Sequence, residues 1–278
     1  MPTTRRIFLS LAALPALSAA APIDAGSIRT RKAGKVETVF KSPGPKPNGL
    51  QATPDGLWII DQGDNHVYLV SYEDGRVIRD LPTEADKASG ITFDGQALWL
   101  ASTYSREMIQ ADGKTGKTIK KYFTPGAGVI YKRTGDAAGR SSPLIKDRPA
   151  PALSSAPARP QPLNTTGTGA HGLEWRDGKF WVAVPPSRMV YRMDAENWVV
   201  EHNFSTIGNR PHGIGWEGRF LWVTDSNLNA FYKHDTETGA IVEKIQLAET
   251  DPLPHGMTIW KGDLWYCDDV GIVCRMKL

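Results

Sequence analysis

The chain repeats one pattern five times: a glycine followed, nine residues later, by a tryptophan. The pairs are Gly49 and Trp58, Gly90 and Trp99, Gly172 and Trp181, Gly213 and Trp222, and Gly256 and Trp265. Successive glycines are 41, 82, 41 and 43 residues apart, and 82 is twice 41. Self-similarity with a period of roughly 40–45 residues and strand-like content is typical of β-propeller blades. The repeat therefore predicts an all-β propeller.

Each tryptophan lies inside a short apolar run, such as residues 57–60 or 180–183, and turn sequences such as Asp55-Gly56 bound these runs. Short apolar runs between turns indicate strands. We expect five recognisable four-stranded blades that form one β-propeller domain over residues 34–278.

Residues 35–41 are expected to close the ring. The segment 34–44 parallels residues 116–126, which form the outermost strand of the second repeat. The last repeat offers only three strands, predicted at 255–260, 264–268 and 272–277. Pairing 35–41 with the last blade supplies its fourth strand and removes exposed edges, which would otherwise template aggregation.

A Pro/Ala/Ser-rich insertion at about 134–168 interrupts the pattern. No aromatic residue occurs between Lys132 and Glu174, and six prolines lie between Pro143 and Pro162. Such a composition cannot bury enough apolar surface to fold alone. The insertion is nearly as long as a blade, so a degenerate sixth blade is the alternative to a long connecting segment.

Residues 1–21 are typical of a cleaved signal peptide. Arg5-Arg6 precede a short apolar run, residues 11–17, and small residues lead up to Ala21. Paired arginines at this position indicate export by the twin-arginine machinery, with an ordinary secretory signal as the alternative. The apolar run is too short to span a bilayer. We expect a periplasmic (or secreted) mature protein without a membrane anchor after cleavage.

Charge excludes one class of partner. The formal net charge is +3 in 278 residues, and the charges are dispersed, so there is no electrostatic footprint for nucleic acid. We expect a monomer whose partner is a small-molecule substrate.

The two cysteines, Cys267 and Cys274, exclude a disulfide-dense scaffold and a Cys-rich zinc site. A two-residue turn at Val270-Gly271 would set them directly opposite each other on neighbouring strands. An exported protein could then form a disulfide. The alternative is two small buried thiols, and the sequence leaves both open.

Histidines recur at one position of the repeat. The residue before each repeat glycine is Asn48, Ser89, His171, His212 or His255. Repeat equivalence predicts that all five surround one mouth of the central channel, at the start of the innermost strands. Three imidazoles with an open position are typical of a catalytic zinc-type site. The alternative is a structural role, with each histidine bonded to a neighbouring backbone.

Acidic residues recur three residues after the tryptophan, at Asp61, Asp225 and Asp268, with Asp269 next to the last. These strands run antiparallel to the inner ones, so the acids should reach the same mouth. They could bind a cation, orient the imidazoles or transfer protons, or they could simply cap backbone N–H groups. The predicted metal ligands are His171, His212, His255, Asp225, Asp268 and Asp269.

Glu174, three residues after His171, has no acidic counterpart in the other repeats. Strand alternation predicts that it faces away from His171. We therefore did not include it among the predicted ligands.

The stretches Pro211-His212-Gly213-Ile214 and Leu221-Trp222-Val223, with the later segment 233–242, resemble the virginiamycin B lyase family. More broadly, they are similar to gluconolactonase-like and quinoprotein-type propellers. The resemblance implies metal-assisted elimination that opens a cyclic ester. It implies that His255 of Pro254-His255-Gly256 is the general base and that Asp269 assists at the metal.

A second resemblance is geometric and concerns only the three histidines. The peptidylglycine α-amidating lyase is also a propeller, and it holds zinc by three histidines near its axis. By this resemblance His171, His212 and His255 would hold the metal in the present chain.

Together these features predict an exported metal-dependent lyase acting on a small organic or ester/lactone substrate at the channel mouth. His171, His212 and His255 are its predicted catalytic residues, and its cofactor is a divalent ion (Zn, Mg, Mn or Ca). Two alternatives remain open because a fold does not fix a function. One is a non-catalytic periplasmic propeller that binds a peptide, sugar or partner protein, and the other is a lactone hydrolase.

Overall fold

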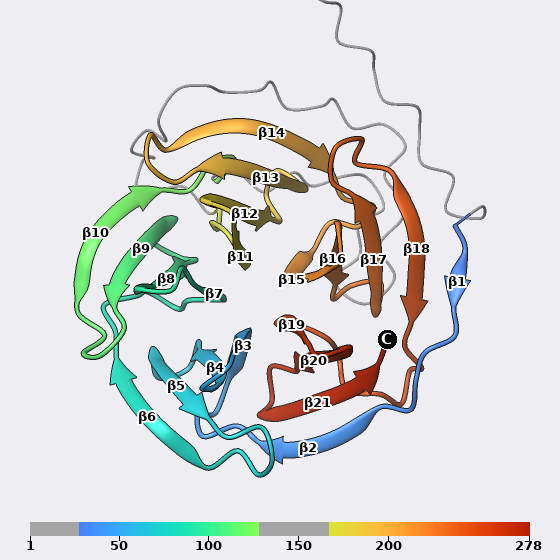
Figure 1. Ribbon diagram of the computed structural model, residues 1–278, viewed down its shortest axis with the longest axis horizontal. Helices are drawn as coiled ribbons and strands as arrows, with labels where there is room; N and C mark the ends of the chain where they lie inside the picture. Colours follow the sequence, from blue (N-terminus) through green and yellow to red (C-terminus); the bar gives the residue numbers. More distant parts are fainter. Residues whose placement is uncertain (1–27, 128–166) are drawn as a thin grey trace, which may run out of the picture.

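The protein is a five-bladed β-propeller in a computed structural model that describes residues 28–127 and 167–278 (Figure 1). Five sheets of mostly antiparallel strands surround a central axis, and in four of them the consecutive strands of a blade run outward from the axis. In the fifth, the outermost strand comes from the start of the described chain. The predicted fold class and blade number are confirmed. The predicted signal peptide and most of the Pro/Ala/Ser-rich insertion lie outside the described residues.

The blades follow the predicted repeat. Blade 1 contains β3 (Pro47–Thr53), β4 (Gly56–Asp61), β5 (His66–Val70) and β6 (Val77–Pro82). Blade 2 contains β7 (Gly90–Phe93), β8 (Ala97–Ser102), β9 (Glu107–Asp112) and β10 (Thr118–Phe123). Blade 3 contains β11 (Gly172–Arg176), β12 (Lys179–Val184), β13 (Met189–Asp194) and β14 (Val199–Ser205).

The remaining two blades involve both ends of the described chain. Blade 4 contains β15 (Pro211–Glu217), β16 (Phe220–Asp225), β17 (Ala230–Asp235) and β18 (Ile241–Gln246). Blade 5 contains β19 (Met257–Trp260), β20 (Asp263–Cys267), β21 (Ile272–Lys277) and, outermost, β2 (Glu37–Lys41). The predicted ring closure is therefore confirmed, because β2 pairs antiparallel with β21.

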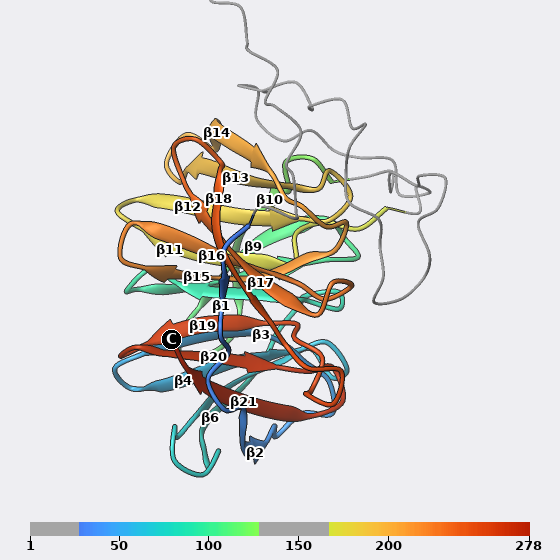
Figure 2. The same ribbon diagram turned by 90° about the vertical axis from the view of Figure 1, so that its right-hand side faces the viewer.

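A fifth strand on blade 4 was not predicted. The strand β1 (Thr30–Arg31) pairs parallel with β18 and crosses the side of the ring (Figure 2). Ion pairs hold it there: Arg31 Nη2 lies 2.6 Å from Glu243 Oε2 and 3.3 Å from Glu217 Oε1. A two-residue strand fixed by side chains leaves no periodic pattern in the sequence.

The repeat glycines lie where the inner strands of neighbouring blades touch. A Cβ atom on Gly172 would collide with the carbonyl oxygen of His212, and one on Gly213 would collide with the backbone nitrogen of Met257. The Gly213 N–H donates a 2.9 Å hydrogen bond to the His255 carbonyl, which joins blades 4 and 5 directly. Glycine is required at these positions because backbone approaches backbone there.

The repeat tryptophans fill the seams between blades. Trp99 of blade 2 packs edge-on against Phe180 of blade 3, with ring centroids 4.4 Å apart, and both side chains are buried. Similar apolar clusters occupy the other seams. The core is therefore a ring of interfaces between blades rather than one central cluster.

The cysteine register predicted from the sequence is wrong by one residue. Cys267 pairs with Val273, and Cys274 pairs with Tyr266. The turn is longer than two residues, because the Asp268 side chain folds it by accepting backbone N–H groups. Neighbouring register positions face opposite sides of a sheet, so the two thiols point into different seams and are free.

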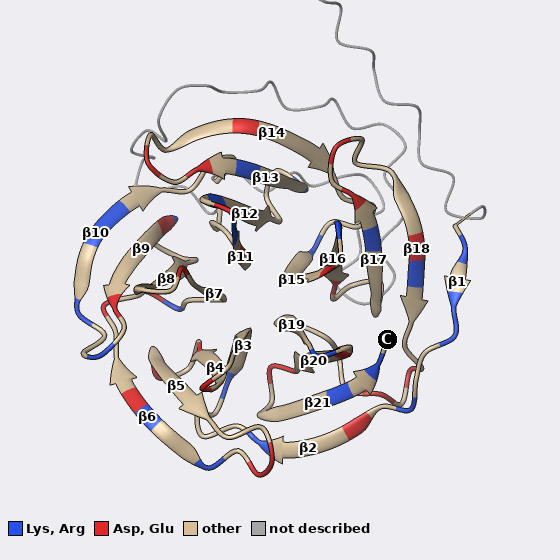
Figure 3. Cartoon of the chain, in the orientation of Figure 1, with Lys and Arg blue, Asp and Glu red and all other residues tan. Residues whose placement is uncertain are grey.

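Charged side chains of both signs lie along the outer strands, whereas the inner strands β7, β15 and β19 are mostly uncharged (Figure 3). Over residues 28–127 and 167–278, no helix is long and apolar enough to cross a membrane.

We predict that Gly172→Ala lowers the free energy of unfolding by about 1–3 kcal/mol or more, because the new methyl group must displace backbone. The matched control is Gly113→Ala, where the nearest atom, Gln96 O, is 3.5 Å from the added Cβ. The control should change stability by less than about 0.5 kcal/mol. Equal losses in chemical denaturation would contradict the role assigned to the repeat glycines.

Candidate active site at the channel mouth

The five residues that precede the repeat glycines occupy equivalent places in the five blades. Each lies within two residues of the start of an inner strand. Three of them donate a backbone hydrogen bond to the second strand: Ser89 to Ala101, His171 to Ala183, and His255 to Cys267. Asn48, Ser89, His212 and His255 are buried, and His171 is partly buried. The structure thus brings the three predicted histidines to one mouth of the channel.

The imidazole ring of His212 contacts those of both His171 and His255. The ring centroids of His171 and His212 are 4.5 Å apart, and those of His212 and His255 are 4.7 Å apart. The second pair is stacked, with an interplanar angle of 23°.

Most of the ring nitrogens have no partner within the described residues. His212 Nε2 accepts a 3.3 Å hydrogen bond from Arg210 Nε, so neutral His212 carries its proton on Nδ1. That Nδ1 has no described partner, and the same is true of His171 Nδ1 and of both ring nitrogens of His255. A buried polar atom without a partner costs roughly 1–3 kcal/mol, so these nitrogens are available to a ligand.

Burial keeps the histidines neutral. It is the largest cause that lowers the pKa of His171 to about 3 and that of His255 to about 4, and it holds the pKa of His212 well below its usual range. The positive charge of Arg210 lowers all three pKa values further. A neutral imidazole can accept a proton or donate a hydrogen bond at physiological pH.

Asp269 is the acid that lies nearest to an imidazole. Its Oδ2 is 3.8 Å from His255 Nδ1, and the side chain is 38 % exposed. The carboxylate favours protonation of His255 and so opposes the effect of burial on that pKa. The family resemblance implied that His255 is the general base and that Asp269 assists at the metal, and these roles stay predictions.

The other acids of this ring bind backbone N–H groups. Asp61 accepts from Lys46, Gly63 and Asp64 at 2.6, 2.7 and 3.2 Å. Asp225 accepts from Arg210, Asn227 and Leu228 at 3.1, 3.0 and 3.0 Å. Asp268 accepts from Val270 and Ile272 at 3.1 and 2.8 Å. These are the bonds expected of the capping alternative.

The predicted metal ligands are not gathered around one point in the described chain. Among residues 28–127 and 167–278, no three His, Cys, Asp or Glu side chains are placed to hold an ion. The stacked rings of His212 and His255 present faces rather than lone pairs to each other, and Asp225 and Asp268 are engaged by backbone N–H groups. Metal ligation by these residues stays a prediction from the sequence.

Two cationic residues at the mouth were missed by the sequence analysis: Lys46 and Arg210. A cation stands two residues before the ring position in three repeats, at Lys46, Lys87 and Arg210. Only Lys46 and Arg210 donate their backbone N–H to a capping aspartate, whereas Lys87 donates to Asn65 Oδ1.

Glu174 lies on the inner strand β11 and is buried. The counterparts of Glu174 in blades 1 and 2 are Gln51 and Thr92, and Thr92 Oγ1 donates a 2.6 Å hydrogen bond to Gln51 Oε1. Burial raises the pKa of Glu174 to about 8, so its carboxyl group is mostly protonated at pH 7.

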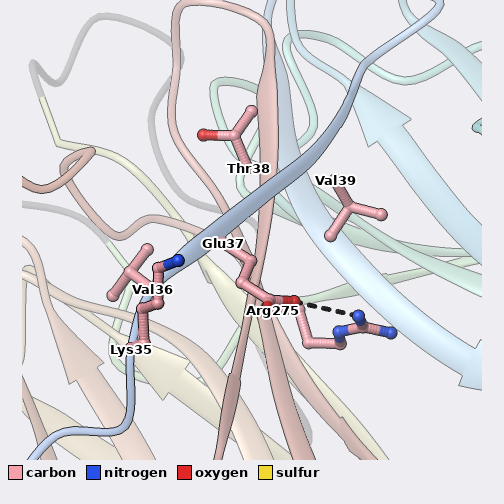
Figure 4. Close-up of a pocket in the computed structure, with 6 residues that line it drawn as sticks. All are labelled: Lys35, Val36, Glu37, Thr38, Val39 and Arg275. Atoms are coloured by element: carbon pink, nitrogen blue, oxygen red, sulfur yellow. Dashed lines mark hydrogen bonds and ion pairs between the residues drawn. The ribbon is translucent and has the colours of Figure 1, made fainter.

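A groove of about 490 Å³ lies away from this site, on the outer side of blade 5 (Figure 4). Its lining residues are Lys35, Val36, Glu37, Thr38, Val39 and Arg275. Arg275 Nη2 donates a 3.0 Å hydrogen bond to Glu37 Oε2 across the β2–β21 pairing. The groove belongs to the ring closure, and none of the predicted site residues lines it.

Two solved structures share this architecture. Glutaminyl cyclase from Myxococcus xanthus aligns with a TM-score of 0.58 and 10% identity, over 91% of this chain and 100% of that chain. Virginiamycin B lyase from Staphylococcus aureus aligns with a TM-score of 0.50 and 16% identity, over 88% of this chain and 99% of that chain. These similarities show a shared fold. Both proteins are enzymes, and the identity is too low to transfer an activity.

The chain matches no family model, and no curated protein is similar to it in sequence.

We predict that Glu174→Gln stabilises the protein more at pH 7.5 than at pH 4. The folded pKa of about 8 lies above the ordinary value of 4.5, so the stabilising contribution is complete below about pH 4.5 and is lost as the pH rises toward 8. The substitution should raise the free energy of unfolding at pH 7.5 by about 2–4 kcal/mol more than it does at pH 4. Exposed Glu196→Gln on the same blade is the control. A pH-independent effect of Glu174→Gln would contradict a buried, protonated Glu174.

Proposed function

We propose that this protein is a lyase that removes a proton adjacent to the carbonyl of a small ester or lactone at the channel mouth. The observation that carries the proposal is His255: it is buried and neutral, both its ring nitrogens are unpartnered in the described chain, and Asp269 lies 3.8 Å from its Nδ1. A neutral imidazole beside a carboxylate is the usual arrangement of a general base and the group that positions it.

In this proposal His255 Nε2 takes the proton from carbon, and Asp269 stabilises the imidazolium that results. The electron pair of the C–H bond becomes a C=C double bond to the neighbouring carbon as the C–O bond of the ester at that carbon breaks. The ester leaves as a carboxylate, and the proton stays on His255. General-base assistance of this kind contributes roughly 10²–10⁴-fold in rate.

His212 is the proposed partner of the carbonyl oxygen. Its Nδ1–H is unpartnered among the described residues, because Arg210 Nε occupies Nε2 and fixes the tautomer. A neutral imidazole can polarise a carbonyl by donating such a hydrogen bond, and it costs no reorganisation during the reaction.

Lactone hydrolysis is the second candidate. Asp269 is 38 % exposed, so water reaches the edge of the proposed base, and the same imidazole could activate a water molecule. A non-catalytic propeller that binds its ligand at this mouth is the third, and turnover separates it from the other two.

The metal predicted from the sequence has no part in any step of this proposal. Metal analysis of the purified protein tests that prediction separately. We also propose that the protein works in the periplasm after twin-arginine export; a mature N-terminus near Pro22, read by mass spectrometry, is what this requires.

The test is proton exchange in D₂O, read by NMR, on a panel of cyclic depsipeptides, simple esters and lactones. We predict that the protein exchanges or eliminates the proton next to the carbonyl of at least one compound. His255→Gln should lose about 10²-fold or more of this activity, and Asp269→Asn about tenfold. His66→Gln is the matched control, because His66 Nδ1 lies 2.6 Å from Asp80 in another His–carboxylate pair on β5, outside the channel.

Full activity of His255→Gln would contradict the assigned base. Release of a ring-opened hydroxy acid in place of an unsaturated product would favour the hydrolase. Binding of panel compounds without exchange or turnover would favour the binding module.

A further inference from the structure

We infer that the channel mouth binds an oxyanion group of its ligand, a carboxylate or a phosphate, with Arg210 as the principal partner. The inference rests on the proposed function in that it names a feature of the substrate of the same site. Three observations support it: the fold fixes the position of Arg210, the guanidinium forms no ion pair in the described chain, and histidine ring nitrogens beside it lack hydrogen-bond partners.

A hydrogen bond fixes the backbone of Arg210 at the channel mouth. Its N–H donates to Asp225 Oδ2 at 3.1 Å, and Gly208 packs so closely on that carboxylate that no Cβ would fit there. Lys46 repeats the arrangement in blade 1, where its N–H donates to Asp61 Oδ2 at 2.6 Å. The fold therefore presents a cation at the same place in two blades, and each is positioned by a capping aspartate.

The Arg210 side chain is oriented and still available. Its Nε donates to His212 Nε2 at 3.3 Å, which turns the guanidinium toward the histidine ring. In residues 28–127 and 167–278, no carboxylate forms an ion pair with Arg210 within 4.0 Å, and its two terminal nitrogens have no other hydrogen bond. A planar guanidinium with free terminal N–H groups matches a carboxylate or phosphate in bidentate geometry.

The buried histidines add donors that lack a partner. His212 carries its proton on Nδ1, which is buried and has no hydrogen-bond partner within the described chain. Both nitrogens of His255 also lack a hydrogen-bond partner there, and one of the two carries the proton of the neutral ring. His212 and His255 are each only 1% exposed. An oxyanion seated beside Arg210 would satisfy such donors, whereas a cation would not.

The charges at the mouth favour an anion. Arg210 and Lys46 both act on His255 electrostatically, so both cations lie near it. Asp269 is the opposing charge beside His255, while Asp61, Asp225 and Asp268 are engaged by backbone N–H groups. Asp225 acts on Arg210 through its charge, but among the described residues no carboxylate forms an ion pair with the guanidinium, which stays open to an anion.

The test titrates the full-length mature protein with sodium acetate and, separately, with inorganic phosphate, while NaCl holds the ionic strength constant. Binding is read from the ¹H–¹⁵N resonances of the histidine rings. We expect the resonances of His171, His212 and His255 to shift with saturation, and that of the outer His66 not to shift. The arm that saturates at the lower concentration identifies the oxyanion as carboxylate or phosphate.

Arg210→Gln should weaken this binding by about tenfold or more, since it removes a charge-assisted bidentate partner. Arg76→Gln removes the same charge from an exposed outer turn and should bind as the unmodified protein does. Lys46→Gln should weaken binding by a smaller factor. Lys46 is exposed, so this variant should fold normally and keeps the inference testable if the Arg210 variant misfolds.

Saturable shifts in neither arm, or equal affinity of Arg210→Gln and Arg76→Gln, would overturn the inference. These outcomes are separate from the fate of the proposed base. His255→Gln can abolish proton exchange while the Arg210-dependent anion binding persists, and anion binding can fail while exchange on neutral esters persists.

Discussion

The structure depends on the close approach of inner strands at the repeat glycines. Five blades surround a narrow axis, and the backbone of one inner strand contacts that of the next at Gly172, Gly213 and Gly256. A side chain at these positions would open the ring. The residue before each glycine is consequently held at the channel mouth, where two pairs of imidazole centroids lie only 4.5 and 4.7 Å apart.

This geometry sets the chemistry that the mouth can perform. Three crowded, buried imidazoles cannot all carry charge, so they stay neutral and their unpartnered nitrogens persist at a cost in stability. Such a cost is expected where a site is preorganised for a ligand. Arg210 supplies the local positive charge, and Asp269 gives His255 its opposing negative charge. The site is thus built from one repeated position, the loop that precedes it in blade 4 and the turn between β20 and β21 in blade 5.

Much of this was predictable because the repeat is periodic. The five-bladed ring, its closure by β2 and the shared mouth of the histidines follow from spacing alone. The misses have local causes. The Asp268 carboxylate lengthens a turn and shifts Cys274 by one position, and the strand β1 depends on ion pairs of Arg31 rather than on a pattern. A cation recurs at the position of Arg210, but the sequence does not show that its Nε bonds to His212.

The most direct test of this account is a ¹⁵N NMR titration of the imidazole nitrogens between pH 8 and pH 4.5. The account predicts that His171, His212 and His255 remain neutral at pH 5.5, because burial beside Arg210 lowers their pKa values well below 6.5. It also predicts that the chemical shifts of His212 are those of the Nδ1–H tautomer, since Nε2 accepts from Arg210. Protonation of all three rings near pH 6.5 would contradict a buried, neutral histidine ring at the channel mouth.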